Sequence, residues 1–159
     1  MRNRSLLAVV LGLCGALSPS AKSAEPAVLA IVVDRENPRT EITVEELRAI
    51  FLGQQREWQD GARIVPLELE TGTSERDVFN ATVLGMDQAE VDRFRVDQRM
   101  RGTGNPPRVA PSPGSLLRLA GRVRGVIGYV PLSAVDGSVK VLKVSGIAPG
   151  KPGYPLRGS

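Results

Sequence analysis

The residues best suited to bind a ligand lie in the segment 64–85. An apolar run at 64–69 predicts a buried strand, and an amphipathic pattern at 76–84 predicts a helix. A small polar turn joins them. Such a strand–turn–helix unit aims unpaired backbone N–H groups at one point, where the helix dipole favours negative charge. The segment is therefore a candidate anion site. Its expected ligand-binding residues are Gly72, Thr73, Ser74 and Arg76.

The same turn also has a purely structural interpretation. Thr73 can cap the helix and, together with water, satisfy its first amides, while Arg76 can pair with Asp77 or Glu75 on the surface. Glu75 is a further obstacle, because its carboxylate already satisfies the positive end of the helix dipole and would repel an oxyanion. At an effective dielectric constant of about 20, two like charges 4 Å apart cost about 4 kcal/mol. Any oxyanion site here is therefore expected to be weak or to need completion by a partner.

The composition rules out most catalytic chemistry. The chain has no histidine, which excludes Ser-His and Cys-His catalysis and every His-ligated metal site. Its single cysteine, Cys14, lies in an N-terminal segment that we expect to be removed. Glu45 and Glu46 are assigned to helix capping, and Glu68 and Glu70 to solvent-facing strand positions, rather than to acid–base pairs. We therefore expect no enzymatic activity, no cofactor and no metal site.

The first 23 residues have the pattern of a signal peptide. Two arginines form a basic start, and the apolar stretch 6–17 is shorter than the roughly 20 residues that a membrane-spanning helix needs. Small residues before the cut predict cleavage between Ser23 and Ala24, so we expect an exported, periplasmic protein. A lipoprotein signal ending at Cys14 is the alternative, although the residue before this cysteine fits it poorly.

The charge distribution argues against a nucleic-acid partner. The whole chain carries 21 basic and 17 acidic side chains, but removal of residues 1–23 leaves 18 basic against 17 acidic, a net charge near +1. Residues 24–90 have a net charge of −8, whereas residues 91–124 carry eight arginines against two aspartates. This uneven field either steers an anionic ligand or an acidic partner, or reflects two solvated faces of opposite sign.

Strands and helices are expected to alternate along the chain. Apolar, β-branched runs predict strands at 28–33, 125–131 and 139–144, in addition to 64–69. Helix starts are predicted at the capping boxes 43–46 and 87–90 and at Ser112-Pro113. The last of these helices is expected to bury Leu116, Leu119, Ala120 and Val123. The alternation favours an α/β fold with a small mixed or parallel sheet flanked by helices.

This α/β unit is expected to span residues 24–145. Residues 146–159 are rich in Gly and Pro and have no packing periodicity, so they are set apart as a C-terminal tail. Within the unit, Trp58 is expected to anchor a turn in the core, and Tyr129 is expected to pack at a strand end.

Four blocks of sequence, in their order and spacing, resemble the phosphate-type periplasmic substrate-binding proteins of ABC transporters. They are 46–53 with 58–61, then 72–79, then 127–130, then 146–149 with 154–157. The block 72–79 is similar to the family's G-S-G-T-R-D-x-F turn and aligns with it without a gap. The resemblance implies one lobe of a type 2 periplasmic binding protein fold, with a small mixed sheet flanked by helices.

The resemblance also implies roles for the turn. Thr73 matches a family serine, Ser74 a glycine and Arg76 an arginine, whereas Glu75 replaces the family's threonine. In the family the ligand lies in a cleft between two lobes, and the first lobe contributes its own glycine-serine turn, which has no counterpart before Val28. We therefore expect a short form similar to the second lobe, without high-affinity phosphate capture on its own.

Two functions of different class remain open at this point. The first is a solute-binding-like domain that binds phosphate or another oxyanion at the turn, with an ABC transporter as its partner. The second is a ligand-free periplasmic module, derived from the same fold, that binds another protein. A homodimer that brings two lobes face to face would rebuild a cleft and combine the two.

Overall fold

The computed structural model describes residues 27–158, so the predicted signal peptide and its cleavage point lie outside the described residues. The strands form one six-stranded sheet in the order β2-β6-β1-β5-β3-β4. Their bounds are β1 (Leu29–Val33), β2 (Glu41–Ile42), β3 (Val65–Leu69), β4 (Arg108–Ala110), β5 (Val126–Pro131) and β6 (Lys140–Val144). β1 pairs antiparallel with β5 and β6, whereas β3 pairs parallel with both β5 and β4. The expected α/β class with a mixed sheet is confirmed.

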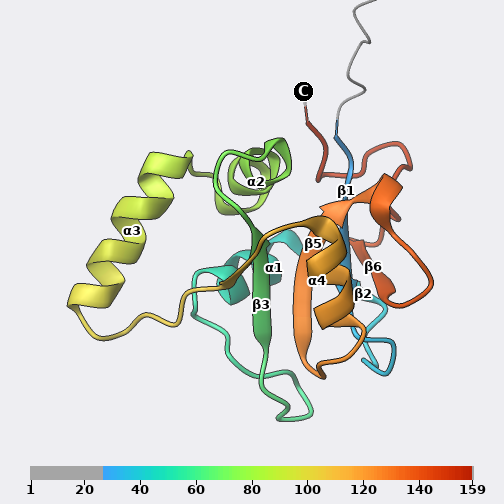
Figure 1. Cartoon of the computed structure of the whole chain (residues 1–159), viewed down its shortest axis with the longest axis horizontal. Helices are drawn as coiled ribbons and strands as arrows, with labels where there is room; N and C mark the ends of the chain where they lie inside the picture. The colour runs from blue at the N-terminus through green and yellow to red at the C-terminus, as the bar shows by residue number, and fades with distance from the viewer. Residues whose placement is uncertain (1–26, 159) are drawn as a thin grey trace, which may run out of the picture.

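Helices cover the sheet and its edges. They are α1 (Val44–Phe51), α2 (Ser74–Phe79), α3 (Gln88–Met100) and α4 (Pro113–Ala120), and α2 continues directly into a π-helical turn, Asn80–Leu84. In Figure 1, α4 crosses in front of the sheet, α1 lies behind it, and α3 stands to one side. None of these helices, all within residues 27–158, is long and apolar enough to cross a membrane.

The predicted helix starts are confirmed, with one difference in how they are capped. Asp87 and Glu90 form a complete capping box, in which each side chain accepts from the other residue's backbone N–H at 2.8 Å. Thr43 caps α1 through the amide of Glu46, but the Glu46 carboxylate binds Arg39 at 2.6 Å instead of reaching back. The Arg39 guanidinium therefore holds the Glu46 carboxylate that the predicted capping box would have placed on the Thr43 amide.

The expected buried stripe of α4 is only partly right. Leu116, Leu117 and Ala120 are buried, whereas Leu119 is 43% exposed and Val123 is 41% exposed. Val123 lies beyond the end of α4 at Ala120, where helical periodicity no longer applies. The three buried residues, Leu116, Leu117 and Ala120, lie on the side of α4 that packs against β5 and β3, and Leu119 lies outside it.

The C-terminal segment is packed into the core, although its sequence has no apolar periodicity. Tyr154 and Leu156 are buried, and the carbonyl of Leu156 accepts a hydrogen bond from the amide of Leu29 at 2.9 Å. This segment runs beside the start of β1 (Figure 1). Isolated apolar residues held by turns can fill a core without any repeating pattern, so periodicity alone did not reveal the contribution of residues 146–158.

Candidate functional site

The predicted turn lies at the carboxyl end of β3 and leads straight into α2. The hydroxyl of Thr73 accepts a hydrogen bond from the amide of Arg76 at 3.3 Å and donates one to the carbonyl of Glu70 at 2.9 Å. Thr73 is therefore the N-cap of α2, as its residue type favours. Its hydroxyl is committed to the backbone rather than aimed at solvent.

Backbone amides at the start of α2 remain available. The amides of Ser74 and Glu75 donate no hydrogen bond within residues 27–158, because they precede the first amide that the helix itself satisfies, that of Asp77. The hydroxyl of Ser74 lies 3.3 Å from the Glu75 carboxylate. The start of α2 thus presents free donor amides beside the Glu75 carboxylate.

Arg76 lies beneath the turn rather than on its surface. Its side chain is 2% exposed, and its guanidinium contacts Glu68 at 3.0 Å, the carbonyl of Leu69 at 2.7 Å and the side-chain oxygen of Gln88 at 2.9 Å. The alternative in which Arg76 pairs with Asp77 or Glu75 on the surface is therefore wrong. Arg76 supports the turn from inside the protein.

Glu68 is also buried, at 3% exposure, so its assignment to a solvent-facing strand position is wrong. The reason is α3, which brings Arg95 over this face of the sheet. Arg95 binds the Glu68 carboxylate through two hydrogen bonds of 2.8 and 2.6 Å. Glu68, Arg76 and Arg95, which we call the buried ion triad, hold two positive charges and one negative charge below the turn.

Tyr129 lies inside β5 rather than at a strand end. Its ring stacks on Phe79 of α2, with ring centroids 4.1 Å apart, and its hydroxyl oxygen accepts a 3.4 Å hydrogen bond from the amide of Leu69. Burial, followed by the nearby Glu68 carboxylate, raises the pKa of Tyr129 well above its ordinary value. The aromatic pair therefore fixes α2, and with it the turn, on the sheet.

Alkaline pH is expected to destabilise the fold. Burial raises the pKa of both Tyr129 and Tyr154 above the ordinary value of 10.0, so the folded chain binds these protons more tightly than the unfolded chain. Their contribution is complete below pH 10 and is lost as the pH rises through the folded pKa values. Urea unfolding followed from about pH 8 to about pH 11 should show a falling free energy of unfolding above pH 10.

Tyr154→Phe supplies the matched control for this prediction. The Tyr154 hydroxyl is buried without a hydrogen-bond partner in the described part of the chain, so its removal should cost little near neutral pH. In this variant the free energy of unfolding should fall less steeply above pH 10 than in the unmodified protein. The interpretation would be wrong if its pH profile paralleled that of the unmodified protein.

A second helix N-terminus lies at the same edge of the sheet. β3 and β4 are parallel, and their last residues, Leu69 and Ala110, are paired. The chain after β3 enters the 70–74 turn, and the chain after β4 enters the cap of α4, so both turns leave the sheet side by side. Around α4, the hydroxyl of Ser112 caps the amide of Ser115 at 3.2 Å.

This second turn adds donors that sequence analysis missed. The amide of Gly114 donates no hydrogen bond within the described residues, and the Arg118 guanidinium donates to the hydroxyl of Ser115 at 2.9 Å. A guanidinium at a helix N-terminus opposes the helix dipole, so an anion there would relieve this arrangement. The Ser-Pro-Gly-Ser sequence at 112–115 did indicate a turn and a helix start. However, β4 has only three residues, and nothing in the sequence showed that it pairs with β3.

A mixed six-stranded sheet of this topology, flanked by helices, has the fold of one lobe of a periplasmic binding protein. No protein-family model matches the chain. Among solved structures it is similar to an ABC-type phosphate transport receptor from Vibrio cholerae, with 26% identity over 84% of this chain and 55% of that one, and a TM-score of 0.70.

Two further structures show the same fold. One is a phosphate ABC transporter substrate-binding protein from Clostridium perfringens with bound phosphate: identity 24%, coverage 77% of this chain and 47% of that one, TM-score 0.64. The other is PstS from Borrelia burgdorferi: identity 19%, coverage 85% and 56%, TM-score 0.68. The chain thus spans about half the length of these structures. The resemblance to phosphate-type substrate-binding proteins is confirmed at the level of the fold.

Proposed function

We propose that this protein is an exported, solute-binding-like domain that binds phosphate or another tetrahedral oxyanion in connection with ABC transport. The observation that carries the proposal is the pairing of Leu69 with Ala110, which places the N-termini of α2 and α4 at one edge of the sheet. Two helix N-termini with free amides favour an anion at that edge. Proteins of similar fold include the phosphate transport receptor from Vibrio cholerae and the substrate-binding protein from Clostridium perfringens with bound phosphate.

The proposed binding groups are mostly backbone donors. The amides of Ser74, Glu75 and Gly114 would bind the oxyanion, Gly72 allows the tight turn, and Arg118 supplies an exposed positive charge. Thr73 and Arg76 would act as positioning residues, because their polar atoms already hold the turn. The net positive charge of the buried ion triad favours an anion above it.

Acidic side chains oppose this binding. Glu70 and Asp77 are exposed, Glu75 is half-buried, and all lie on or beside the turn. We therefore expect affinity in the millimolar range for the lobe alone. A transporter component, or a second lobe, would raise this affinity by covering the edge and adding further donors.

Ser74→Pro is expected to weaken phosphate binding about tenfold without unfolding the protein. Ser74 is the first residue of α2, where proline is tolerated, and Thr73 before it has the extended conformation (φ −85°, ψ 141°) that a following proline requires. The substitution therefore deletes one donor amide, together with the exposed Ser74 hydroxyl that contacts the Glu75 carboxylate. Calorimetric or NMR titration of inorganic phosphate into the mature protein measures the effect.

Glu75→Gln is the matched test in the opposite direction. Removal of its charge should strengthen phosphate binding by about tenfold, because a like charge beside the anion is lost. The proposal fails if neither variant changes phosphate binding, or if phosphate gives no signal at millimolar concentration. Chloride at equal ionic strength controls for non-specific screening.

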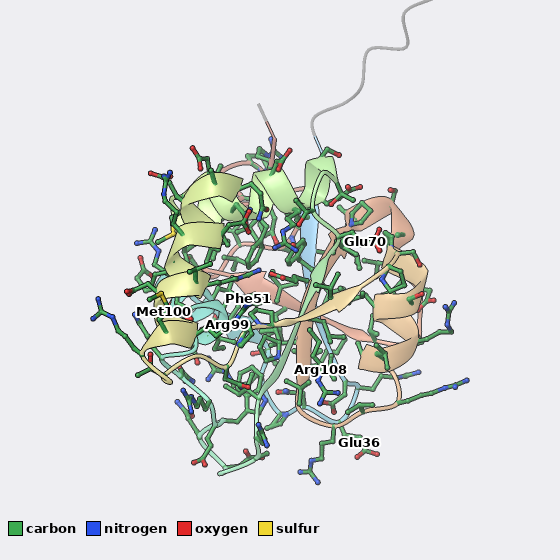
Figure 2. All side chains as sticks on the ribbon, turned by 60° about the vertical axis from the view of Figure 1, so that its left-hand side comes forward. Glu36, Phe51, Glu70, Arg99, Met100 and Arg108 are labelled. Atoms are coloured by element: carbon green, nitrogen blue, oxygen red, sulfur yellow. The ribbon has the colours of Figure 1, made fainter. Side chains whose placement is uncertain are left out.

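A protein-interaction module is the second candidate, favoured by exposed apolar side chains around α3 and the sheet edge. Met100 is 83% exposed, Val109 of the edge strand β4 56% and Val96 51%. Met100 lies beside Arg99 at the outer end of α3 (Figure 2). Light scattering after size exclusion tests whether two copies associate. A monomer that binds phosphate favours the first function, and a dimer or complex without phosphate binding favours this one.

A further inference from the structure

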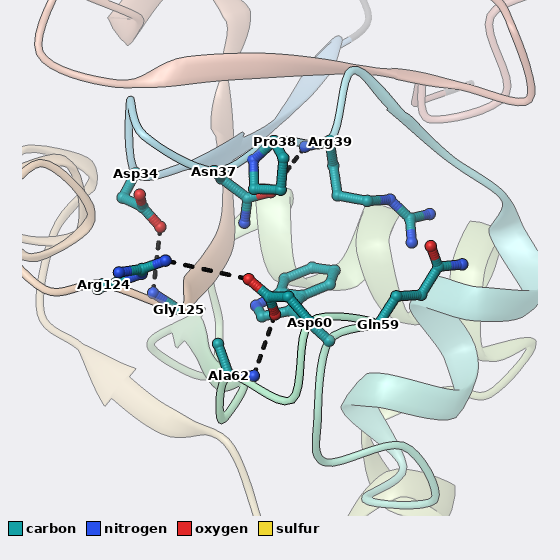
Figure 3. A pocket seen from close by; sticks show the side chains of 10 residues that line it. Asp34, Asn37, Pro38, Arg39, Gln59, Asp60, Ala62, Arg124 and Gly125 are labelled. Atoms are coloured by element: carbon teal, nitrogen blue, oxygen red, sulfur yellow. Dashed lines mark hydrogen bonds and ion pairs between the residues drawn. The ribbon is translucent and has the colours of Figure 1, made fainter.

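A separate cavity opens at the opposite edge of the sheet from the proposed oxyanion site. It has a volume of about 390 Å³, within the range of small-molecule sites. Its wall includes Ala62, which precedes β3, and Gly125, which precedes β5, so it lies at the amino ends of these parallel strands. Figure 3 shows Asp34, Asn37, Arg39, Asp60 and Arg124 around it.

Asp34 is the dominant polar group of this cavity. It is 7% exposed, and its carboxylate accepts a 3.1 Å hydrogen bond from the amide of Gly125. No basic side chain in the described part of the chain lies within salt-bridge distance of it. A buried carboxylate without a countercharge is costly, and a cation in the cavity would offset that cost.

The other charges around the cavity leave this carboxylate uncompensated. Arg39 is held by Glu46 at 2.6 Å, and Arg124 lies 4.0 Å from Asp60. Each of these two guanidiniums therefore has its own carboxylate nearby, and neither pairs with Asp34. The two aspartates and two arginines that line the cavity balance in charge, so the attraction for a cation is local to the Asp34 carboxylate. The Lys140 ammonium beside the cavity is bound to the carbonyl of Asn37 at 2.7 Å. The lining favours a monocation. Only two carboxylates, Asp34 and Asp60, line it, and no group of three or more Asp, Glu, His or Cys side chains that could hold a metal ion occurs in the described part of the chain.

Trp58 provides the second, independent observation. It lines the cavity, is 6% exposed, and its indole N–H has no hydrogen-bond partner within the described residues. The Arg39 guanidinium lies 5.8 Å from the ring centroid, so this ring already accepts a cation over its face. Such a buried donor without a partner marks a place where an acceptor atom is missing.

We propose that this cavity binds a small organic monocation whose ammonium or guanidinium N–H groups donate to Asp34. The cation lies against the wall formed by Trp58, and a hydroxyl on the ligand accepts from the indole N–H. An amino alcohol has both groups, so ethanolamine is the first probe. This site is independent of the oxyanion site, because the two lie at opposite ends of β3.

Trp58 is the only tryptophan of the chain, so its single indole N–H resonance reports directly on the cavity. Ethanolamine and methylguanidinium should shift this resonance in a saturable way. Propanol, which lacks the charge, and tetramethylammonium, which lacks N–H donors, should bind at least about tenfold more weakly. Inorganic phosphate should leave the resonance in place, so the two proposals can fail separately.

Asp34→Asn is the decisive variant. Its side-chain oxygen can still accept from Gly125, but the charge is gone, and affinity for the cations should fall about tenfold or more. Asp60→Asn, which removes a more exposed carboxylate, is the matched control and should change affinity less than about threefold. The proposal is overturned if no saturable shift occurs at millimolar cation, if propanol binds equally well, or if both variants behave alike. Should Asp34→Asn not fold, the propanol comparison on the unmodified protein still decides.

Discussion

Glu68→Ala is expected to lower the free energy of unfolding by about 3–5 kcal/mol. The substitution removes the single carboxylate of the buried ion triad and leaves Arg76, at 2% side-chain exposure, and Arg95, at 16%, facing each other without a countercharge. Breaking a buried ion pair by removing one partner is far more costly than losing an exposed one, because the remaining charge is still desolvated.

The matched control is Asp97→Ala, which breaks the Arg101–Asp97 pair on the surface of α3. That pair is also 3.0 Å long, but its side chains are 71% and 55% exposed, and we expect a loss of less than about 1 kcal/mol. Urea unfolding of both variants measures the difference. Equal losses would show that the buried ion triad contributes no more than a surface pair.

The same substitution should loosen α3 more than the rest of the fold. The two Arg95–Glu68 hydrogen bonds tie this helix to β3, and α3 otherwise buries only Val91 fully. Native-state hydrogen exchange of the α3 amides should therefore accelerate in Glu68→Ala before the core strands open. This readout distinguishes a local tether from a general loss of stability.

Gly125→Ala is expected to cost about 3–5 kcal/mol, the second large effect. Gly125 has a φ of +84°, and an added Cβ would lie 2.2 Å from the carbonyl oxygen of Arg63. The backbone cannot move away easily, because its carbonyl accepts from Val65 at 2.9 Å and its amide donates to Asp34 at 3.1 Å. The conformational strain of a positive φ and the steric overlap with Arg63 therefore both contribute to the loss of stability at this position.

Gly61→Ala separates these two causes. Gly61 has a similar φ of +79°, but an added Cβ would have no heavy atom within 4 Å. Only the conformational strain remains there, and we expect a cost of about 1 kcal/mol. Thermal or urea unfolding of the two variants gives the comparison. If Gly125→Ala were no worse than Gly61→Ala, the strand entry at residue 125 would have to be far more adaptable than its hydrogen bonds indicate.

Local features of the chain were predictable because their causes are local. The turn before α2, its Thr73 cap and the Asp87 capping box depend on residues within four positions of one another. Short apolar runs identified β1, β3, β5 and β6 for the same reason. The strand β4 escaped prediction, because three residues carry too little periodicity to distinguish a strand from a loop.

Propensity, capping and hydrophobic pattern act over short distances, so the fold class, the main strands and helix starts, and the candidate turn could be predicted from the sequence alone. The surroundings of Glu68 and Arg76 depend on tertiary contacts, because Arg95 reaches Glu68 from 27 residues away. The tertiary structure also placed the cap of α4 beside the turn and isolated Asp34 in a cavity. Such contacts depend on chain crossings and strand order, and a polar residue in a linear pattern does not show whether a distant helix will cover it.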